Sequence, residues 1–251
     1  FVDIEEVKAA GTKATMVSLA DPAKTMGAAA NVFGLWDQTT DRLVKLLTHV
    51  AQQPDFPESI DQFALHIVEL VDLNPDIAIY RSVRQDNAKN FYYGYTHAVF
   101  TAVLCILMSR HLKWSTVYMM SLVKAALTMN IGMAREQDSL SRQNSPMTDW
   151  QRTLVADHPA LGEDMLHKLG VDDPLQLDLV RWHHTPLSEE GLPANLIPRR
   201  LLNLADVFVA RTAARSTRSA LSPVAAVKTM VFGAEGDDLG LGSALAQAVG
   251  F

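Results

Sequence analysis

The segment RWHHTPLSEEGLPANLIPRRLLNLADVFVARTAARSTR, residues 181–218, carries the most informative pattern in the chain. It contains adjacent histidines, His183 and His184, and one aspartate, Asp206, in an otherwise apolar helical pattern. Successive helical side chains point about 100° apart, so both histidines can reach one metal only where the helix ends. Thr185-Pro186 predicts that end, because a residue before proline is pushed out of the α region. The carboxylate of Asp206 is then either buried and paired or part of a binding site.

The composition is that of an ordinary globular protein. Of the 251 residues, 48% are apolar and 20% charged, which suffices for one good-sized core or two small ones. The net charge of −6 argues against a general nucleic-acid binder but not against a small anionic ligand held by local arginines. The single cysteine, Cys105, lies among apolar residues, so no intramolecular disulfide can form. We therefore expect a cytoplasmic protein.

No membrane association is expected from the sequence. The longest apolar run, residues 98–108, falls well short of the roughly 20 residues that a membrane helix needs. No signal-peptide pattern opens the chain. Because the sequence begins with Phe1 rather than methionine, we expect it to be a piece of a longer protein.

Helical periodicity runs along the whole chain, whereas no alternating strand pattern occurs. Helices are predicted near residues 41–50, 60–71, 97–111, 116–132, from 148 onward, from His158-Pro159, at 197–214 and from Ser222-Pro223. Ser115 and Thr148 are predicted N-caps, and Gly132 is predicted to end its helix. The polar segment 134–146 is predicted to be a loop. The fold class predicted from these patterns is all-α.

Several weak signals recur in a fixed order. A histidine, His97, heads an apolar helix; His-Pro-x-x-Gly follows at 158–162, then the pair His183-His184, and then Asp206 with arginines nine and twelve residues later. This order resembles the HD-GYP family, bacterial phosphohydrolases of the HD superfamily that typically cut cyclic-di-GMP with a two- or three-metal site. HPALGEDML looks like the family's HPxxGxxIL, and ADVFVARTAARSTRSALSP looks like its ADVFDALTxxRxYRxALSP.

The resemblance implies an architecture as well as a site. It covers residues 59–251, which we expect to form an HD-superfamily helical bundle, and residues 1–58 are expected to add N-terminal helices. The close at Phe251 looks truncated relative to the family. By resemblance, His97 and Asp206 would belong to one metal position.

The other metal position implied by the resemblance would consist of His158, His183 and His184. Three neutral imidazoles can hold a metal ion with water in the open place, so the expected cofactor is none or one divalent ion of iron, zinc or manganese. The alternative is an empty, hydrogen-bonded histidine cluster in which Asp206 accepts from His97. Taken alone, His97 would be a structural residue and His158 a surface helix terminus.

The chain departs from the family at four positions that matter for chemistry. Where the family has the His-Asp dyad, whose aspartate bridges the metals, this sequence reads Met129-Asn130. Methionine suits hard or borderline cations poorly, and asparagine supplies no negative charge. The lysine that usually follows the next glycine is Met133, and the glutamate four residues before His97 is Tyr93.

Two arginines, Arg215 and Arg218, match positions that contact nucleotide phosphates in the family. A planar guanidinium suits that role because it forms bidentate hydrogen bonds to phosphate. The alternative is a pair of solvated charges on an exposed helix end.

The motifs and the lost ligands together favour a degenerate HD-GYP-like signalling domain that lacks cyclic-di-GMP phosphodiesterase activity. Such a domain would act by binding cyclic-di-GMP or a signalling protein, with no nucleic-acid polymer and no membrane as partner. The first alternative is a metal-dependent phosphohydrolase that uses a residual three-His site. The second is a helical dimerisation or scaffold unit, and a homodimer is compatible with each of these functions.

Overall fold

The fold is known from a computed structural model that describes residues 29–50, 55–83, 92–184, 195–215, 218–231 and 240–250. The helices are α2 (Ala29–Thr48), α3 (Phe56–Leu73), α4 (Pro75–Val83), α5 (Tyr93–His111), α6 (Thr116–Thr128), the 3-10 turn η4 (Ile131–Met133), α7 (Ala134–Arg142), α8 (Asp149–Lys168), α9 (Pro174–Trp182), α10 (Leu196–Thr212), α11 (Pro223–Val231) and α12 (Leu241–Ala248). The β-structure of these ranges is limited to one antiparallel bridge, between Arg215 and Arg218. The predicted all-α class is confirmed.

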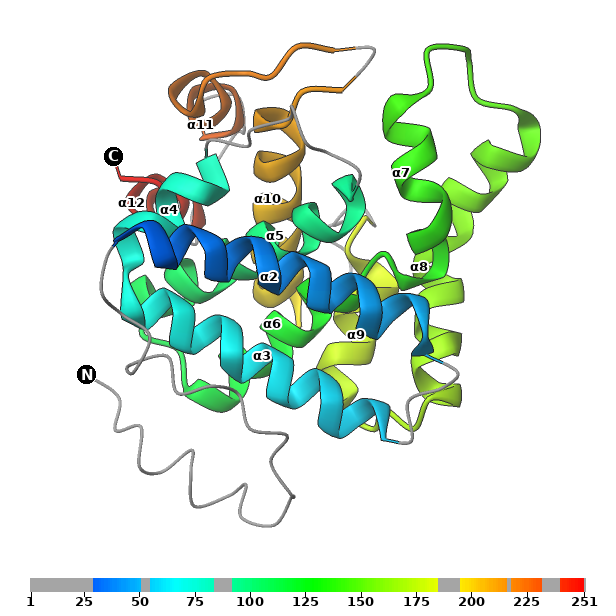
Figure 1. The fold of residues 1–251 in the computed structure, drawn as a ribbon, viewed down its shortest axis with the longest axis horizontal. Coiled ribbons are helices and arrows are strands. Elements are labelled where there is room, and N and C mark those ends of the chain that lie inside the picture. The colour runs from blue at the N-terminus through cyan, green and yellow to red at the C-terminus, as the bar shows by residue number, and fades with distance from the viewer. Residues whose placement is uncertain are drawn as a thin grey trace.

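Helix α5 forms the centre of the molecule. Its residues 98–106 are buried on every side, because they are apolar around the whole circumference of the helix. In Figure 1, α5, α6 and α10 lie in the middle, α2 and α3 cross in front, and α7 and α8 lie at one side. One hydrophobic core includes residues from α2 through α12. His97, in the first turns of α5, is therefore placed in the interior.

Predicted caps set the starts of two helices. The Ser115 hydroxyl oxygen accepts a hydrogen bond from the Tyr118 amide (3.3 Å) at the start of α6. At the start of α8, Thr148 and Gln151 form a reciprocal capping box. Both N-cap predictions are confirmed, because each side chain satisfies an amide that has no partner within the helix.

The predicted end of the helix at Gly132 is wrong. Helix α6 ends at Thr128, and residues 131–133 form the tighter turn η4. Glycine is needed there because the turn comes close to the backbone of α8, and not because a helix ends at it. A Cβ at Gly132 would lie 2.5 Å from the carbonyl oxygen of His158 and 2.9 Å from the amide nitrogen of Gly162. The turn therefore packs directly against the backbone of α8.

Two further boundary predictions are wrong. The polar segment predicted as a loop contains α7, which buries none of its residues and is anchored where Asp138 accepts a hydrogen bond from the Gly94 amide (2.8 Å). Because α7 has few apolar residues, its sequence shows no helical period of apolar positions. Helix α8 runs unbroken through Pro159, so His158-Pro159 does not begin a helix.

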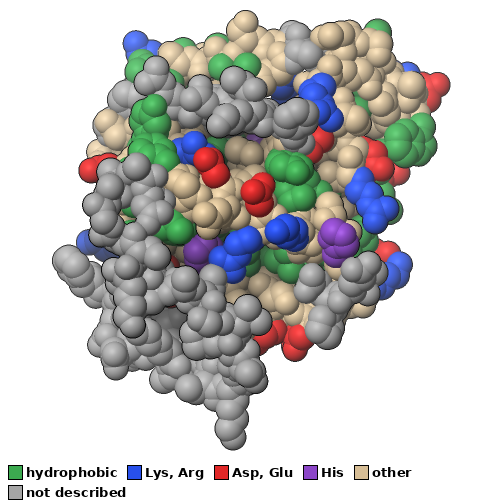
Figure 2. All heavy atoms as spheres, in the orientation of Figure 1, with side chains coloured by type: hydrophobic (Ala, Val, Ile, Leu, Met, Phe, Trp, Pro, Cys, Tyr) green, Lys and Arg blue, Asp and Glu red, His purple; other side chains and the backbone are tan. Residues whose placement is uncertain are grey.

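The surface charge and the longest apolar segment are relevant to nucleic-acid and membrane binding. On the face in Figure 2, the described basic and acidic side chains are interspersed, unlike a continuous nucleic-acid-binding surface. By length and composition, Thr116–Arg142 could cross a membrane. The fold divides this segment into α6, η4 and α7, and 61% of its most apolar window is buried inside the protein, as in a core helix.

Candidate metal centre

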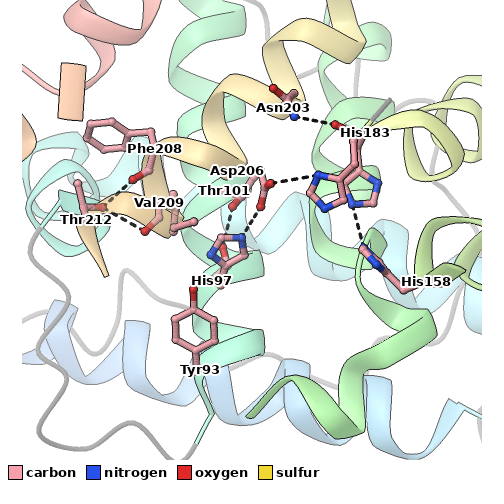
Figure 3. A network of polar contacts seen from close by, with 12 residues as sticks. Tyr93, His97, Thr101, His158, His183, Asn203, Asp206, Phe208, Val209 and Thr212 are labelled. Carbon is pink, nitrogen blue, oxygen red and sulfur yellow. Dashed lines mark hydrogen bonds and ion pairs between the residues drawn. The ribbon is translucent and has the colours of Figure 1, made fainter. Parts of the chain in front are cut away.

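The structure brings the five predicted ligand residues to one place (Figure 3). His97 comes from α5, His158 from α8, His183 and His184 from the end of α9, and Asp206 from α10. Asp206 lies between His97 and the other histidines. His183 is the C-cap of α9, which confirms that the helix ends where the histidine pair requires it. Thr185-Pro186, the predicted cause of that end, lies outside the described residues.

His97 and Asp206 form a buried pair. The Nε2 atom of His97 donates to Oδ1 of Asp206 over 2.6 Å. Burial alone would raise the pKa of the Asp206 carboxyl. The hydrogen bond from His97 and the positive charges that His97, His183 and His184 can carry outweigh burial and hold this pKa at about 2. The pairing considered as an alternative to metal is therefore present, but it leaves Nδ1 of His97 buried without a hydrogen-bond partner in the described part of the chain.

The other three histidines converge, and the tautomers of His158 and His183 are fixed by main-chain contacts. Nδ1 of His158 donates to the carbonyl oxygen of Val155 (2.7 Å), and Nδ1 of His183 donates to that of Val180 (2.8 Å). A carbonyl oxygen only accepts, so in each neutral ring the hydrogen is on Nδ1 and the lone pair is on Nε2. The two Nε2 atoms face each other 3.2 Å apart.

Local helix chemistry explains why these two carbonyls are available. In α8 the carbonyl of Val155 would normally accept from the amide four residues later, which is Pro159 and carries no hydrogen. The carbonyl of Val180 lies in the last turn of α9, where carbonyls have no partner within the helix. The His-Pro sequence and the helix end thus set the same tautomer in both rings.

Two facing lone pairs repel unless they share a proton, a water or a cation. Burial, with a smaller contribution from charge on His184, lowers the pKa of His158 to about 4 and that of His183 to about 3. Both rings are therefore neutral at neutral pH and do not relieve the contact by protonation. Candidate ligand atoms of His158, His183 and His184 all lie within 4.8 Å of one another. This neutral donor set fits a divalent metal of the kind that three histidines bind.

Asn203 belongs to the site but was missed in the sequence. Its Nδ2 donates to the carbonyl oxygen of His183 over 2.8 Å. The available signal was its position on α10, three residues before Asp206, because residues three apart share a helix face. Asn203 and Asp206 thus approach the histidines from one helix (Figure 3).

The four positions that differ from the family are all buried. Met129 and Asn130 precede η4, and Met133 ends it. The Tyr93 ring stacks on His97, with centroids 5.8 Å apart and planes 27° apart. Burial raises the pKa of the Tyr93 hydroxyl, so it is a neutral phenol.

Arg215 and Arg218 lie beyond the end of α10 and not on an exposed helix end. Their main chains pair in the antiparallel bridge, with N–O distances of 2.8 and 3.1 Å. Nε and Nη2 of Arg215 donate to the Tyr93 hydroxyl over 3.0 and 2.6 Å. Nη2 of Arg218 donates to the carbonyl oxygen of Ala210. Both residues are nevertheless exposed overall.

The comparison with protein families agrees with this arrangement. The model of the HD domain matches residues 69–238, which is more than half of the chain. No curated protein matches. The HD domain is a fold of metal-dependent phosphohydrolases, and the histidine cluster lies within the matched residues. The chain therefore belongs to the HD-domain family.

Proposed function

We propose that this chain is an HD-GYP-like signalling domain that does not hydrolyse cyclic-di-GMP and acts by binding a nucleotide or a protein partner. The carrying observation is the buried pair Met129-Asn130 at the dyad position beside η4. The five predicted ligands contain one carboxylate, Asp206, which is already bonded to His97.

The chemistry of phosphodiester hydrolysis supports this proposal. Two cations a few ångströms apart can stabilise both the attacking and the leaving oxygen, and a bridging carboxylate holds them together. Asn130 is neutral, and the thioether of Met129 is a soft ligand that suits such cations poorly. We expect the hydrolysis rate to fall by several orders of magnitude relative to an ordinary enzyme turnover of about 1–10³ s⁻¹.

The chain's own residues supply a reason to expect binding. If a metal is bound, His158, His183 and His184 would hold it, and it would supply a Lewis acid and a water of lowered pKa. Asp206 keeps a negative charge beside these rings. Arg215 and Arg218 are exposed residues whose main chains are joined by one backbone bridge, so two positive charges lie close together, which suits an anionic ligand.

The experiment measures hydrolysis and binding separately. The protein is loaded in turn with Mn²⁺, Fe²⁺ and Zn²⁺ and incubated with cyclic-di-GMP, and products are separated by chromatography. Calorimetry measures binding for the parent, Arg218→Ala and the control Arg152→Ala, whose side chain contacts Asp149 on α8. We expect no ordinary turnover and about tenfold weaker binding for Arg218→Ala alone. Turnover at an enzymatic rate would refute the proposal.

If the parent does not bind cyclic-di-GMP, the ligand arm of the proposal fails and the protein-partner arm is tested. A capture experiment with the purified domain as bait should then retain a partner protein. If no captured protein binds the domain saturably, the protein-partner hypothesis is refuted as well.

A second candidate function is a phosphohydrolase that uses the residual three-His site. The facing Nε2 atoms of His158 and His183 favour it, because that arrangement suits a cation. His183→Ala should then remove both the metal and any phosphohydrolase activity. Unchanged activity in that variant would exclude this candidate.

A further inference from the structure

We propose that Tyr93 and Arg215 close the His97–Asp206 half of the centre, so that the chain takes a single divalent ion at His158, His183 and His184. This inference goes beyond the proposed function, which holds with or without a bound metal. Metal stoichiometry and hydrolysis are measured separately, so either proposal can fail while the other stands.

The two halves of the centre differ in the donors that they leave available. In the three-His half, the lone pairs of His158 and His183 point at each other and have no donor between them. In the other half, Nε2 of His97 and Oδ1 of Asp206 are joined at 2.6 Å and buried, and the remaining lone pair of His97 is on Nδ1 and directed away from Asp206. A cation there would have to break that bond, whereas a cation in the three-His half relieves a repulsive contact.

The Tyr93 ring covers one face of the His97 imidazole. Tyr93 is 4% exposed, and its ring lies nearly parallel to the His97 imidazole. Both groups are on α5, four residues apart, so the helix itself holds the stack. The space on this side of His97 is therefore filled by carbon atoms of the chain.

Arg215 adds a fixed positive charge to this cover. Two of its N–H groups donate to the Tyr93 hydroxyl, and its guanidinium carbon lies 5.0 Å from the centre of the Tyr93 ring. The hydroxyl oxygen thus faces a guanidinium already and is a poor place for a second cation. Like charges repel, so Arg215 opposes a metal ion on its side of the centre.

The first test counts metal ions. The parent, His183→Ala and His97→Ala proteins are loaded with Zn²⁺, dialysed, and analysed by elemental mass spectrometry, and Co²⁺ absorption spectra report the ligand set. We expect about one equivalent for the parent and for His97→Ala, and almost none for His183→Ala. Two equivalents in the parent, no metal in the parent, or loss of the metal in His97→Ala would overturn the inference.

The second test reopens the closed half. Tyr93→Glu removes the ring, releases Arg215 and places a carboxylate beside His97 and Asp206. The matched control is Tyr92→Glu, which adds the same charge one residue earlier at a side chain that is 42% exposed. We expect a second equivalent of Zn²⁺ only in Tyr93→Glu. One equivalent in a folded Tyr93→Glu protein, or two in the control, would overturn the inference. If Tyr93→Glu does not fold, the first test decides.

Discussion

The side-chain amide of Asn203 and the main-chain carbonyl of His183 are joined by a hydrogen bond of 2.8 Å. This bond ties α10 to the residue that ends α9, where the histidine pair begins. Asn203 contacts the main chain of His183 and not its ring, so it acts on the ring by fixing the backbone that carries it.

Replacing Asn203 with alanine should therefore loosen the three-His cluster. We expect Zn²⁺ affinity to fall about tenfold, as for other groups that orient a ligand, and stability to fall by about 1 kcal/mol. Affinity is measured by competition with a chelating dye, and stability by urea denaturation. Asn195→Ala is the control, because Asn195 begins the same helix without a side-chain cap bond. Equal Zn²⁺ affinity in both variants would show that Asn203 does not position the ligand.

Replacing Pro159 with alanine should separate stability from metal affinity. The new amide would compete with Nδ1 of His158 for the Val155 carbonyl, so the tautomer would no longer be fixed. Because proline inside a helix costs about 3 kcal/mol, we expect the variant to gain up to that amount in stability while Zn²⁺ affinity falls about tenfold.

The control for this prediction is Pro174→Ala. Pro174 is the first residue of α9, where a missing amide hydrogen breaks no helical bond. Its replacement should change neither quantity appreciably. Urea denaturation and dye competition are run on both variants, and a Pro159→Ala protein that binds Zn²⁺ as tightly as the parent would contradict the expected role of the His-Pro sequence.

Gly132→Ala should destabilise the protein strongly. The added Cβ would meet backbone atoms of α8, at 2.5 Å from the His158 oxygen, and a backbone cannot rotate away as a side chain can. We expect a loss of about 2–3 kcal/mol in urea denaturation. Gly34→Ala on α2 is the control, since a Cβ there meets nothing within 4 Å and should leave stability unchanged or raise it by up to about 1 kcal/mol. A Gly132→Ala protein that is as stable as the parent would refute close packing at this position.

Stability should fall in acid because of His66. Burial, followed by the nearby charge of Arg42, lowers the pKa of His66 from 6.5 to about 4. Below pH 6.5 the imidazole of His66 is protonated in the unfolded chain, whereas in the folded chain it stays neutral until about pH 4. Stability therefore decreases as pH falls through this window. The largest loss of folding stability that this residue can cause is about 3 kcal/mol.

His66→Gln tests the acid dependence. Nε2 of His66 lies 3.2 Å from the Thr39 hydroxyl, which itself donates to the Leu35 carbonyl, so a glutamine amide can replace the imidazole as donor. Denaturation at pH 7 and at pH 4.5 should show a smaller difference for the variant than for the parent. Part of the dependence should remain, since His158 and His183 are shifted in the same direction. Identical pH profiles would rule out this contribution of His66.

The sequence predicted the helical class and pointed to five candidate ligand residues that the fold brings together, because both depend on patterns that are local or fixed in order. His97, His158, His183 and Asp206 each sit at a definite point of a helix, and the order of those points carried the resemblance. Ser115 and Thr148 were found as caps for the same reason. Whether the five residues bind metal, and whether the domain division lies at residue 58, remain predictions.

The missed features depend on contacts between distant segments. The glycine at 132 predicts a helix end, because nothing near it in sequence shows that α8 passes within contact distance. The contact between Tyr93 and Arg215 spans more than 120 positions, and no local period announces it. Helix α7 was missed because it has few apolar residues, and the bond that anchors it, from the Gly94 amide to Asp138, joins distant segments.

Helix α10 and the residues just after it make hydrogen bonds to both halves of the centre. Asn203 reaches the main chain of His183, Asp206 reaches His97, and Arg215, just past the end of the helix, reaches Tyr93. The same helix has an exposed Ile197 in its first turn. Sliding α10 by one residue, about 1.5 Å, would strain all three bonds at once. A partner that displaced this helix would therefore change the geometry of both halves of the centre at the same time.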